Sequence, residues 1–369
     1  MKISVLQENL HKALAHLQKA IPSKPQLPIL SSVLISVKEL ECTIAATDLY
    51  FGVKTNIQAD SSESGTIVIP GKELREIVSS LPAGPLTLTF QDSTVTIQNE
   101  TTTATLQCHS SDEYPPFPQV EVDSEEISIE TLEKINSYVS FSSSTDQARP
   151  VLTSILLQTN KEQVTAVSTD GFRLSKLDLV GISLSQAENV LIPAQSLSEV
   201  CRIGKQIGAK KLKWAVSSEL KQVLFTIEDT EVYVRMIEGE FPPYQKIIPT
   251  TFETEVFFNT QELVDNLKRS LIFARDASNI VRFSFKDQKV SLLATSPSIG
   301  KFVGELPIAS VSGKDNEIAF NARYVLDYLA VIPSEEVTLK MLESLKPALF
   351  TSPEVLDHQY VVMPFKIHG

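Results

Sequence analysis

The sequence is poor in the features that mark secreted and membrane-bound proteins. Its 369 residues include only three cysteines, spread far apart at Cys42, Cys108 and Cys201. They give no disulfide framework and suit a reducing compartment. No apolar run approaches the roughly 18 residues that a membrane span needs, and the opening MKISVLQENLHKALAHLQKAIP is broken by polar residues, unlike a signal peptide. We therefore expect a cytoplasmic protein that makes no membrane contact.

Sequence motifs for common catalytic sites are also missing. The chain has no GxxxxGK[ST] phosphate loop, no GxGxxG fingerprint, no GxSxG elbow and no HExxH pair. Its five histidines show no spacing typical of metal ligands, at His11, His16, His109, His358 and His368. The sequence therefore predicts no catalytic site, no cofactor and no metal. A hydrolase whose carboxylates lie far apart in the sequence is the alternative that motifs alone leave open.

Acidic residues outnumber basic ones, and the formal net charge is −12. This charge argues against a nucleic-acid partner, unless the basic residues gather on one face. Six segments with helical spacing of apolar residues together carry a charge of +1, namely 8–20, 71–81, 130–142, 194–206, 260–271 and 321–331. Two interpretations stay open: the acids merely collect in linkers, or relatively basic helices face an anionic polymer and bind it without reading its sequence.

Three stretches of the chain repeat one pattern. A short apolar strand, a Pro or Asn and then a helical pattern begin at Ile67, Val190 and Ile318. Other landmarks recur in the same order, and the spacing between repeats is 122 to 128 residues. Such periodicity indicates homologous structural units. We predict an α+β protein of three repeated domains, each with two helices packed on antiparallel β-sheets, at residues 1–122, 123–250 and 251–369.

The segment Thr169-Asp170-Gly171-Phe172-Arg173 places a hydroxyl, an acid and an arginine within five residues, as an active site might be built. The repeat places Thr47 and Thr295 at the same position as Thr169. Asp-Gly between two alternating apolar runs is a strong hairpin signal, because glycine tolerates the positive φ of such turns. The pattern therefore favours a repeated turn over a catalytic group.

Several segments carry a resemblance to a known family: MKISVLQENLHKAL, LPIL (27–30), the Thr-Asp pairs, STDGFRLS (168–175), EGEFPPY (238–244), FNARYVLDYL (320–329) and YVVMPFKI (360–367). In these segments, and along its whole length, the chain resembles the bacterial β sliding clamps, the processivity subunits of DNA polymerase III. The resemblance implies three sliding-clamp domains that form half of a ring. It also implies a head-to-tail homodimer that encircles duplex DNA, is opened by a clamp loader, and tethers the replicative polymerase without catalysing a reaction.

The resemblance further implies a pocket between domains 2 and 3 for short hydrophobic peptides of replicative and repair polymerases and other proteins. Carried over by position, its residues are Leu152, Thr169, Gly171, Phe172, Arg173, Leu174, Pro242, Lys246, Ile247, Asn321, Tyr324, Val361, Val362, Met363, Pro364, Phe365, Lys366 and Ile367. We call this set the predicted peptide site, in which Arg173 and the backbone would orient the peptide. Phe172 stands where His is frequent and Lys246 where Arg is, so peptide preference is expected to differ.

Two expectations follow for the predicted peptide site. Truncation after Gln359 would abolish peptide binding and leave the ring assembled. The substitution Leu174→Asp would place an unpaired charge in the apolar site and weaken all partners together.

The resemblance also assigns residues to two other surfaces. DNA-facing positions are Lys24, Lys72, Arg149, Arg202 and Lys205. At the dimer interface, Leu106 of domain 1 would meet Ile272 and Phe273 of domain 3. An alternative from another class is a tandem-domain protein-binding module that does not encircle DNA.

Overall fold

The chain folds into helices packed on antiparallel sheets, the α+β class that the sequence predicts. The computed structural model describes residues 1–38, 41–61, 63–120, 122–160, 163–182, 184, 189–307 and 309–366. Within these residues it has six α-helices and four β-sheets. The chain forms two compact units, Met1–Leu132 with Ser196–Met236, and Glu133–Gln195 with Ile237–Gly369. We refer to them as unit 1 and unit 2.

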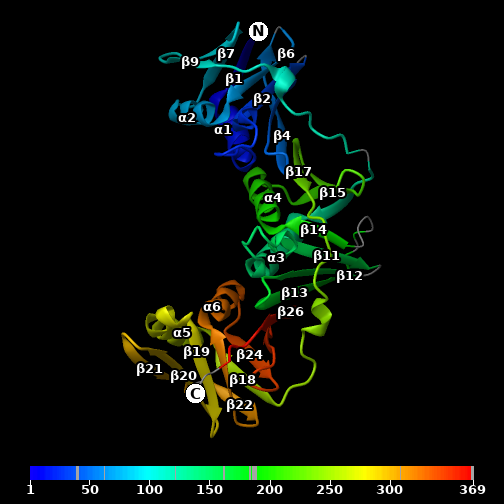
Figure 1. Cartoon of the computed structure of the whole chain (residues 1–369). Helices are drawn as coiled ribbons and strands as arrows, with labels where there is room; N and C mark the ends of the chain where they lie inside the picture. The colour runs from blue at the N-terminus through cyan, green and yellow to red at the C-terminus, as the bar shows by residue number, and fades with distance from the viewer. Residues whose placement is uncertain are drawn as a thin grey trace. The chain divides into compact units, whose positions relative to one another are not determined.

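Unit 1 contains a five-stranded sheet, β5-β1-β7-β8-β9, and an eight-stranded sheet, β10-β15-β16-β17-β4-β3-β2-β6. Its helices α1 and α2 pack against each other, and α1 also contacts β4 (Figure 1). The elements are β1 Lys2–Leu6, α1 Gln7–His16, β2 Ser32–Lys38, β3 Glu41–Thr47, β4 Phe51–Gln58, β5 Asp60–Ser61, β6 Gly65–Pro70, α2 Gly71–Ser80, β7 Pro85–Gln91, β8 Thr94–Gln98, β9 Thr103–Gln107, β10 Glu125–Ser128, β15 Lys211–Ser217, β16 Gln222–Ile227 and β17 Thr230–Arg235. The division between the units falls within α3 Ile129–Val139 and α4 Ala194–Ile207.

Unit 2 contains a nine-stranded sheet, β14-β11-β12-β13-β26-β25-β24-β18-β22, and a four-stranded sheet, β21-β20-β19-β23. Helix α5 packs on β20 and β21 and against α6. The elements are β11 Ser154–Asn160, β12 Gln163–Thr169, β13 Arg173–Val180, β14 Asn189–Pro193, β18 Thr254–Asn259, α5 Thr260–Ala274, β19 Ile280–Lys286, β20 Lys289–Ser296, β21 Gly300–Glu305, β22 Ser310–Gly313, β23 Asn316–Asn321, α6 Ala322–Val331, β24 Glu336–Met341, β25 Ala348–Ser352 and β26 Val355–Val362.

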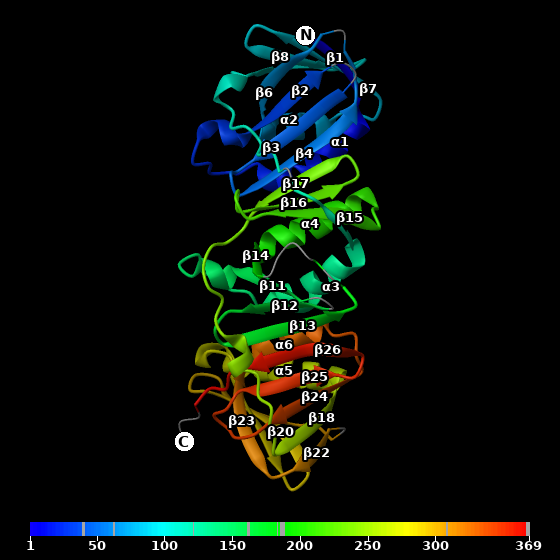
Figure 2. The ribbon, with the colours of Figure 1, turned by 90° about the vertical axis from the view of Figure 1, so that its right-hand side faces the viewer.

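Both large sheets join strands that the repeat assigns to different domains. In unit 1, β17 pairs with β4, so that Val234 lies opposite Phe51; in unit 2, β26 pairs with β13, so that Val362 lies opposite Arg173 (Figure 2). A continuous ladder therefore crosses each predicted boundary, and the compact units do not coincide with the three repeats. The boundaries after residues 122 and 250 stay predictions.

The strand-to-helix landmark of the repeat is confirmed. Strands β6, β14 and β23 end at Pro70, Pro193 and Asn321, and a helix begins at the next residue in each case. At the third junction, Asn321 Oδ1 accepts the backbone N–H of Arg323 at 3.0 Å. This bond satisfies one of the donors that the first turn of a helix leaves without a partner.

The charge of the helices differs from the expected +1. Helix α1 ends at His16, and Lys19 lies in the short 3₁₀ turn Gln18–Ala20. With these bounds the six helices are neutral in sum, and the net charge of −12 lies outside them. In the described part of the chain, no helix is long and apolar enough to cross a membrane. In that part, too, no cluster of His, Cys, Asp and Glu is suited to hold a metal ion.

Candidate functional site

One face of the nine-stranded sheet gathers much of the predicted peptide site. The strand registers align Leu174 of β13 with Val361 of β26, and Val361 with Leu349 of β25. These three side chains are buried in one cluster with Leu156 and Tyr244. The linker that follows β17 contributes to the same cluster through half-buried apolar residues, which are Ile237, Phe241, Ile247, Ile248 and Phe252. The linker therefore crosses the face where β13 and β26 meet.

The segment Thr169–Arg173 is the turn between β12 and β13, as predicted. Asp170 Oδ1 accepts the backbone N–H groups of Phe172 at 2.8 Å and Arg173 at 3.0 Å. Thr169 Oγ1 donates to the carbonyl of Arg173 and accepts the N–H of Gly171. Gly171 has a φ of +94°, a conformation that glycine adopts without a steric cost. The polar side chains thus close a hairpin, and catalysis is not needed to explain them.

The first repeat builds the same turn with different residues. Asp48 Oδ1 accepts the N–H groups of Tyr50 and Phe51, and Thr47 Oγ1 accepts the N–H of Leu49. Leu49 takes the place of Gly171 and has a φ of +76°. The matching bonds confirm that the Thr-Asp pairs are equivalent positions of a structural repeat.

Arg173 is held by two aspartates, and its expected part in orienting the peptide stays a prediction. Its Nε donates to Asp170 Oδ2 at 3.0 Å, and its Nη1 donates to Asp327 Oδ2 of α6 at 2.5 Å. The guanidinium also lies over the Tyr324 ring, 4.6 Å from the centroid. Only 11% of the side chain is exposed. Arg173 therefore joins the β12–β13 turn to α6.

The accessible part of the predicted peptide site lies beside this turn. Phe172 is 49% exposed, and its carbonyl accepts the N–H of Met363 at 2.8 Å. Lys246 is exposed, and Leu152, Pro242, Met363, Pro364 and Phe365 are half-buried. The N–H of Phe365 donates to the carbonyl of Ala319 at 2.8 Å. The run after β26 thus continues along the turn toward β23.

Other members of the predicted peptide site have structural roles. Asn321 caps α6 through its side chain, and Leu174 and Val361 are only 2% and 1% exposed. Tyr324 supports Arg173. Val362 is fully buried on β26, Lys366 is exposed, and Ile367 lies outside the described residues.

Burial of the altered residues adds an effect on stability to two of the expected variants of this site, whose effects on binding stay predictions. Tyr360 is fully buried and stacks on Tyr328, with ring centroids 4.9 Å apart. Truncation after Gln359 would remove this ring and the end of β26, and would disturb the core as well as peptide binding. Leu174→Asp would likewise bury a charge in the core, so it tests stability more than recognition.

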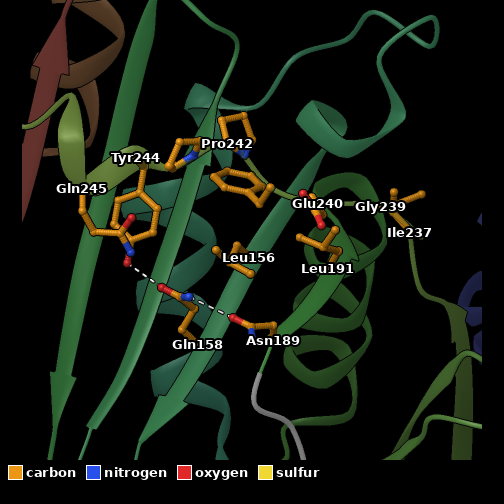
Figure 3. A pocket seen from close by; sticks show the side chains of 12 residues that line it. Leu156, Gln158, Asn189, Leu191, Ile237, Gly239, Glu240, Pro242, Tyr244 and Gln245 are labelled. Carbon is orange, nitrogen blue, oxygen red and sulfur yellow. Dashed lines mark hydrogen bonds between the residues drawn. The ribbon is translucent and has the colours of Figure 1, made fainter.

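A distinct pocket of about 410 Å³ opens at the other end of the same sheet face (Figure 3). It shares one residue, Pro242, with the predicted peptide site. Its lining residues are Leu156, Gln158, Asn189, Leu191, Ile237, Gly239, Glu240, Phe241, Pro242, Pro243, Tyr244 and Gln245. We call it the Gln158 pocket. Tyr244 donates its hydroxyl hydrogen to Gln158 Oε1 at 2.6 Å, and Gln158 Nε2 donates to Asn189 Oδ1 at 2.8 Å.

Sequence reasoning missed Tyr244 and Asp327 as members of this region. A signal for Tyr244 was present, because Glu-Tyr-Pro-Pro-Phe at 113–117 and Glu-Phe-Pro-Pro-Tyr at 240–244 recur in the two linkers. Burial raises the pKa of the Tyr244 hydroxyl, with a smaller contribution from the charge of Asp178. The hydroxyl therefore stays protonated and donates its bond to Gln158. No sequence signal pointed to Asp327, which lies 154 positions from Arg173.

The basic residues predicted to face DNA differ in their surroundings. Arg202 donates to Glu199 Oε1, to Gln206 Oε1 and to the carbonyl of Ala15, so its guanidinium is engaged within unit 1. Lys72 lines a pocket of about 520 Å³ at the start of α2, together with Ser23 from the loop that carries Lys24. Lys24, Lys72, Arg149 and Lys205 are exposed. Arg149 forms an exposed ion pair with Asp146.

Of the residues predicted for the dimer interface, Leu106 lies on an edge strand, and Ile272 and Phe273 lie on helix α5, which packs on another edge strand. Leu106 is on β9, the last strand of the five-stranded sheet. Phe273 of α5 stacks on Phe302 of β21, the last strand of the four-stranded sheet, with ring centroids 6.0 Å apart. Beside them, Ile272 and Val303 are 52% and 58% exposed. Apolar side chains therefore accompany unpaired strand edges in both units.

Comparison with known families covers nearly all of these elements. Three descriptions match in order: DNA polymerase III beta subunit, N-terminal domain, at residues 1–118; central domain, at 126–243; and C-terminal domain, at 245–366. The chain belongs to the DNA polymerase III beta subunit family. The three predicted clamp domains are thereby confirmed as the architecture of the chain.

Individual beta subunits are similar over the full length. The beta sliding clamp of Synechocystis sp. is 29% identical over 392 residues and covers 100% of both chains; that of Staphylococcus aureus is 28% identical over 89% of both. Among solved structures, the DNA polymerase III beta chain of Streptococcus pneumoniae has a TM-score of 0.95 at 26% identity, covering 99% of this chain and 100% of that one. The beta subunit of Thermotoga maritima has a TM-score of 0.93 at 27% identity, covering 100% of both.

Proposed function

We propose that this chain is a DNA sliding clamp: two copies form a ring that encircles duplex DNA in the cytoplasm and tethers the replicative polymerase. The observation that supports this most is the match of all three beta-subunit domains, in order, along one chain. Retention would then be topological, so the ring need not bind DNA tightly. Opening the ring falls to a clamp loader, and the clamp itself has no catalytic site.

The charge distribution suits a ring that slides. Helices that are neutral in sum, in a chain of net charge −12, repel a phosphate backbone less than the rest of the surface does. Exposed Lys24, Lys72, Arg149 and Lys205 supply contacts to phosphates, which are independent of base sequence and weaken with salt. Arg202 is left out of this set, because its hydrogen bonds hold α4 to the end of α1.

The partner-binding surface is proposed at the turn that carries Phe172. The half-exposed phenyl ring and the nearby Met363 offer an apolar contact that adapts to several peptides. Arg173 contributes by fixing the turn against α6. Lys246 at the rim is exposed and suits an acidic residue of the peptide.

Retention on DNA tests the function directly. The protein is loaded by a bacterial clamp loader onto nicked circular plasmid, the plasmid is cut at one site, and bound protein is followed through a gel-filtration column. A clamp stays on circles and is lost from linear ends. Equal retention on both would mean ordinary surface binding. Retention on neither, with a known clamp loaded in parallel, would favour the alternative of a protein-binding module that does not encircle DNA.

A further inference from the structure

The Gln158 pocket is not used by any role described above. Its volume of about 410 Å³ falls within the range of pockets that bind small molecules and single side chains. Leu156 and Leu191 form its floor and are 3% and 6% exposed. Tyr244 meets Phe241 edge-on, with ring centroids 6.4 Å apart. Leucine side chains and two aromatic rings therefore form the apolar part of a lining that is otherwise polar.

One end of the pocket is polar and neutral. Figure 3 shows Tyr244, Gln158 and Asn189 joined in a row by hydrogen bonds. Gln158 Nε2 gives one of its two hydrogens to Asn189, and the second suits a carbonyl oxygen of a ligand. Glu240, the one charged residue of the lining, is exposed. These groups fit an apolar side chain on a peptide backbone, next to a lysine or arginine.

The pocket and the predicted peptide site lie on one sheet face. Strand registers place Leu191 opposite Leu156, Leu156 opposite Val167, and Leu174 opposite Val361, all within one buried cluster. In the order β14-β11-β12-β13, three strand spacings separate Leu191 from Leu174. Leu174 lies opposite Thr169, two residues along β12 from Val167. With neighbouring strands about 4.8 Å apart and about 3.4 Å per residue along a strand, Leu191 and Leu174 are roughly 16 Å apart. An extended chain covers that distance in about five residues.

We infer that the Gln158 pocket binds a flanking segment of the same partner peptide whose core occupies the predicted peptide site. Pro242 belongs to both sites and provides the continuity between them. The flanking segment carries one leucine or aromatic residue, about four or five positions from the core, with a basic residue beside it for Glu240. This inference rests on the proposed partner-binding role and adds a second recognition element to it.

The test uses peptides selected on the full-length protein. A hexapeptide core is first selected from a random displayed library and labelled with fluorescein. A second library adds six random residues to either end of that core, and the tightest extended peptide is selected. Fluorescence anisotropy then gives the affinity of both peptides for the wild-type chain and for three variants. These are Asn189→Trp, which fills the pocket mouth, Glu240→Lys, and Glu354→Trp, an exposed control on the β25–β26 turn.

We expect the extended peptide to bind on the order of tenfold more tightly than the core, as burial of one apolar side chain allows. Asn189→Trp should make the two peptides equal in affinity, Glu240→Lys should remove part of the gain, and Glu354→Trp should leave the gain intact. The inference is overturned if the extension adds no affinity, or if the gain in affinity survives Asn189→Trp. In either case binding of the core peptide would still support the proposed partner site. If the exposed-site variant Phe172→Asp does not weaken the core peptide, the proposed partner site itself fails, and the inference fails with it.

Discussion

Arg173 joins the β12–β13 turn to helix α6, and its removal tests how much that connection contributes. Asp170 is 15% exposed on its side chain and Arg173 11%. In Arg173→Met the Asp170 carboxylate loses its charged partner in a poorly hydrated place. We expect the free energy of unfolding to fall by about 2 kcal/mol, measured by urea denaturation followed by circular dichroism.

Arg149 provides a matched control for this variant. Its Nε lies 3.1 Å from Asp146 Oδ2, with the same sequence spacing as the Arg173–Asp170 pair, but both side chains are about half exposed. Arg149→Met should therefore cost less than about 1 kcal/mol. If both variants lose the same free energy of unfolding, burial of the Arg173–Asp170 pair does not increase its contribution to stability.

His358 makes the stability of the fold depend on pH. Burial lowers its pKa from 6.5 to about 4, while a hydrogen bond to the Tyr138 carbonyl opposes the shift. The unfolded chain therefore binds a proton at a higher pH than the folded chain does. The stability that neutral His358 contributes is therefore present above pH 6.5, and this contribution is lost as the pH falls toward 4.

The loss should be visible between pH 7 and pH 5. From the two pKa values, His358 removes about 2 kcal/mol of stability over this interval. Urea denaturation gives the free energy of unfolding at pH 7 and at pH 5. The decrease between the two pH values should be smaller by this amount in His358→Gln than in the wild-type chain. His11→Gln, in which the imidazole replaced is exposed, should keep the wild-type difference. An unchanged difference in His358→Gln would assign the pH dependence to other groups.

At the scale of elements, β26 and the residues after it have separable roles. Strand β26 ends at Val362, and the run beginning at Met363 lies along the β12–β13 turn. Truncation after Val362 should keep the buried strand and its stacked Tyr360, while removing the apolar contact for the peptide. We expect a peptide affinity at least tenfold lower, by fluorescence anisotropy, with a circular dichroism spectrum like that of the full chain.

Truncation after Gln359 is the informative comparison for β26. It also removes Tyr360, which stacks on Tyr328 and donates its hydroxyl hydrogen to the carbonyl of Tyr324. This shorter chain should melt at a clearly lower temperature, since loss of a buried aromatic residue costs about 3–5 kcal/mol. If both truncations melt like the full chain and both bind peptide, the end of the chain is neither core nor site.

The elements themselves could be predicted from local signals, and their contacts could not. All six helices appear where apolar spacing indicated them, because an amphipathic pattern and a strand-to-helix break are properties of neighbouring residues. The Thr169–Arg173 turn was predictable for the same reason. The ion pair of Arg173 with Asp327 and the row formed by Tyr244, Gln158 and Asn189 depend on distant segments. A hairpin signal specifies that two consecutive strands pair, but no local pattern specifies which distant strands become neighbours.

At the scale of the whole molecule, the repeat predicted three domains, while compactness gives two units. The difference arises because β4 with β17, and β13 with β26, extend one sheet across each junction between repeats. The two smaller sheets, of five and four strands, each stay within one repeat and have β9 and β21 as edge strands. An open edge with apolar side chains invites another strand. The same arrangement, continued between two chains, would close a ring.

Ring formation is therefore expected to depend on the exposed apolar residues beside β21. In a head-to-tail dimer one surface meets a different surface of the partner, and closure repeats the contact twice. Ile272→Asp places a charge beside that edge, and sedimentation velocity should show monomers at concentrations where the wild-type chain is dimeric. Leu356→Asp is the matched control, since Leu356 is 82% exposed on β26. If Ile272→Asp remains dimeric, the dimer interface does not include this surface. If it is monomeric and is no longer retained on circular DNA, retention depends on the dimer that this surface forms.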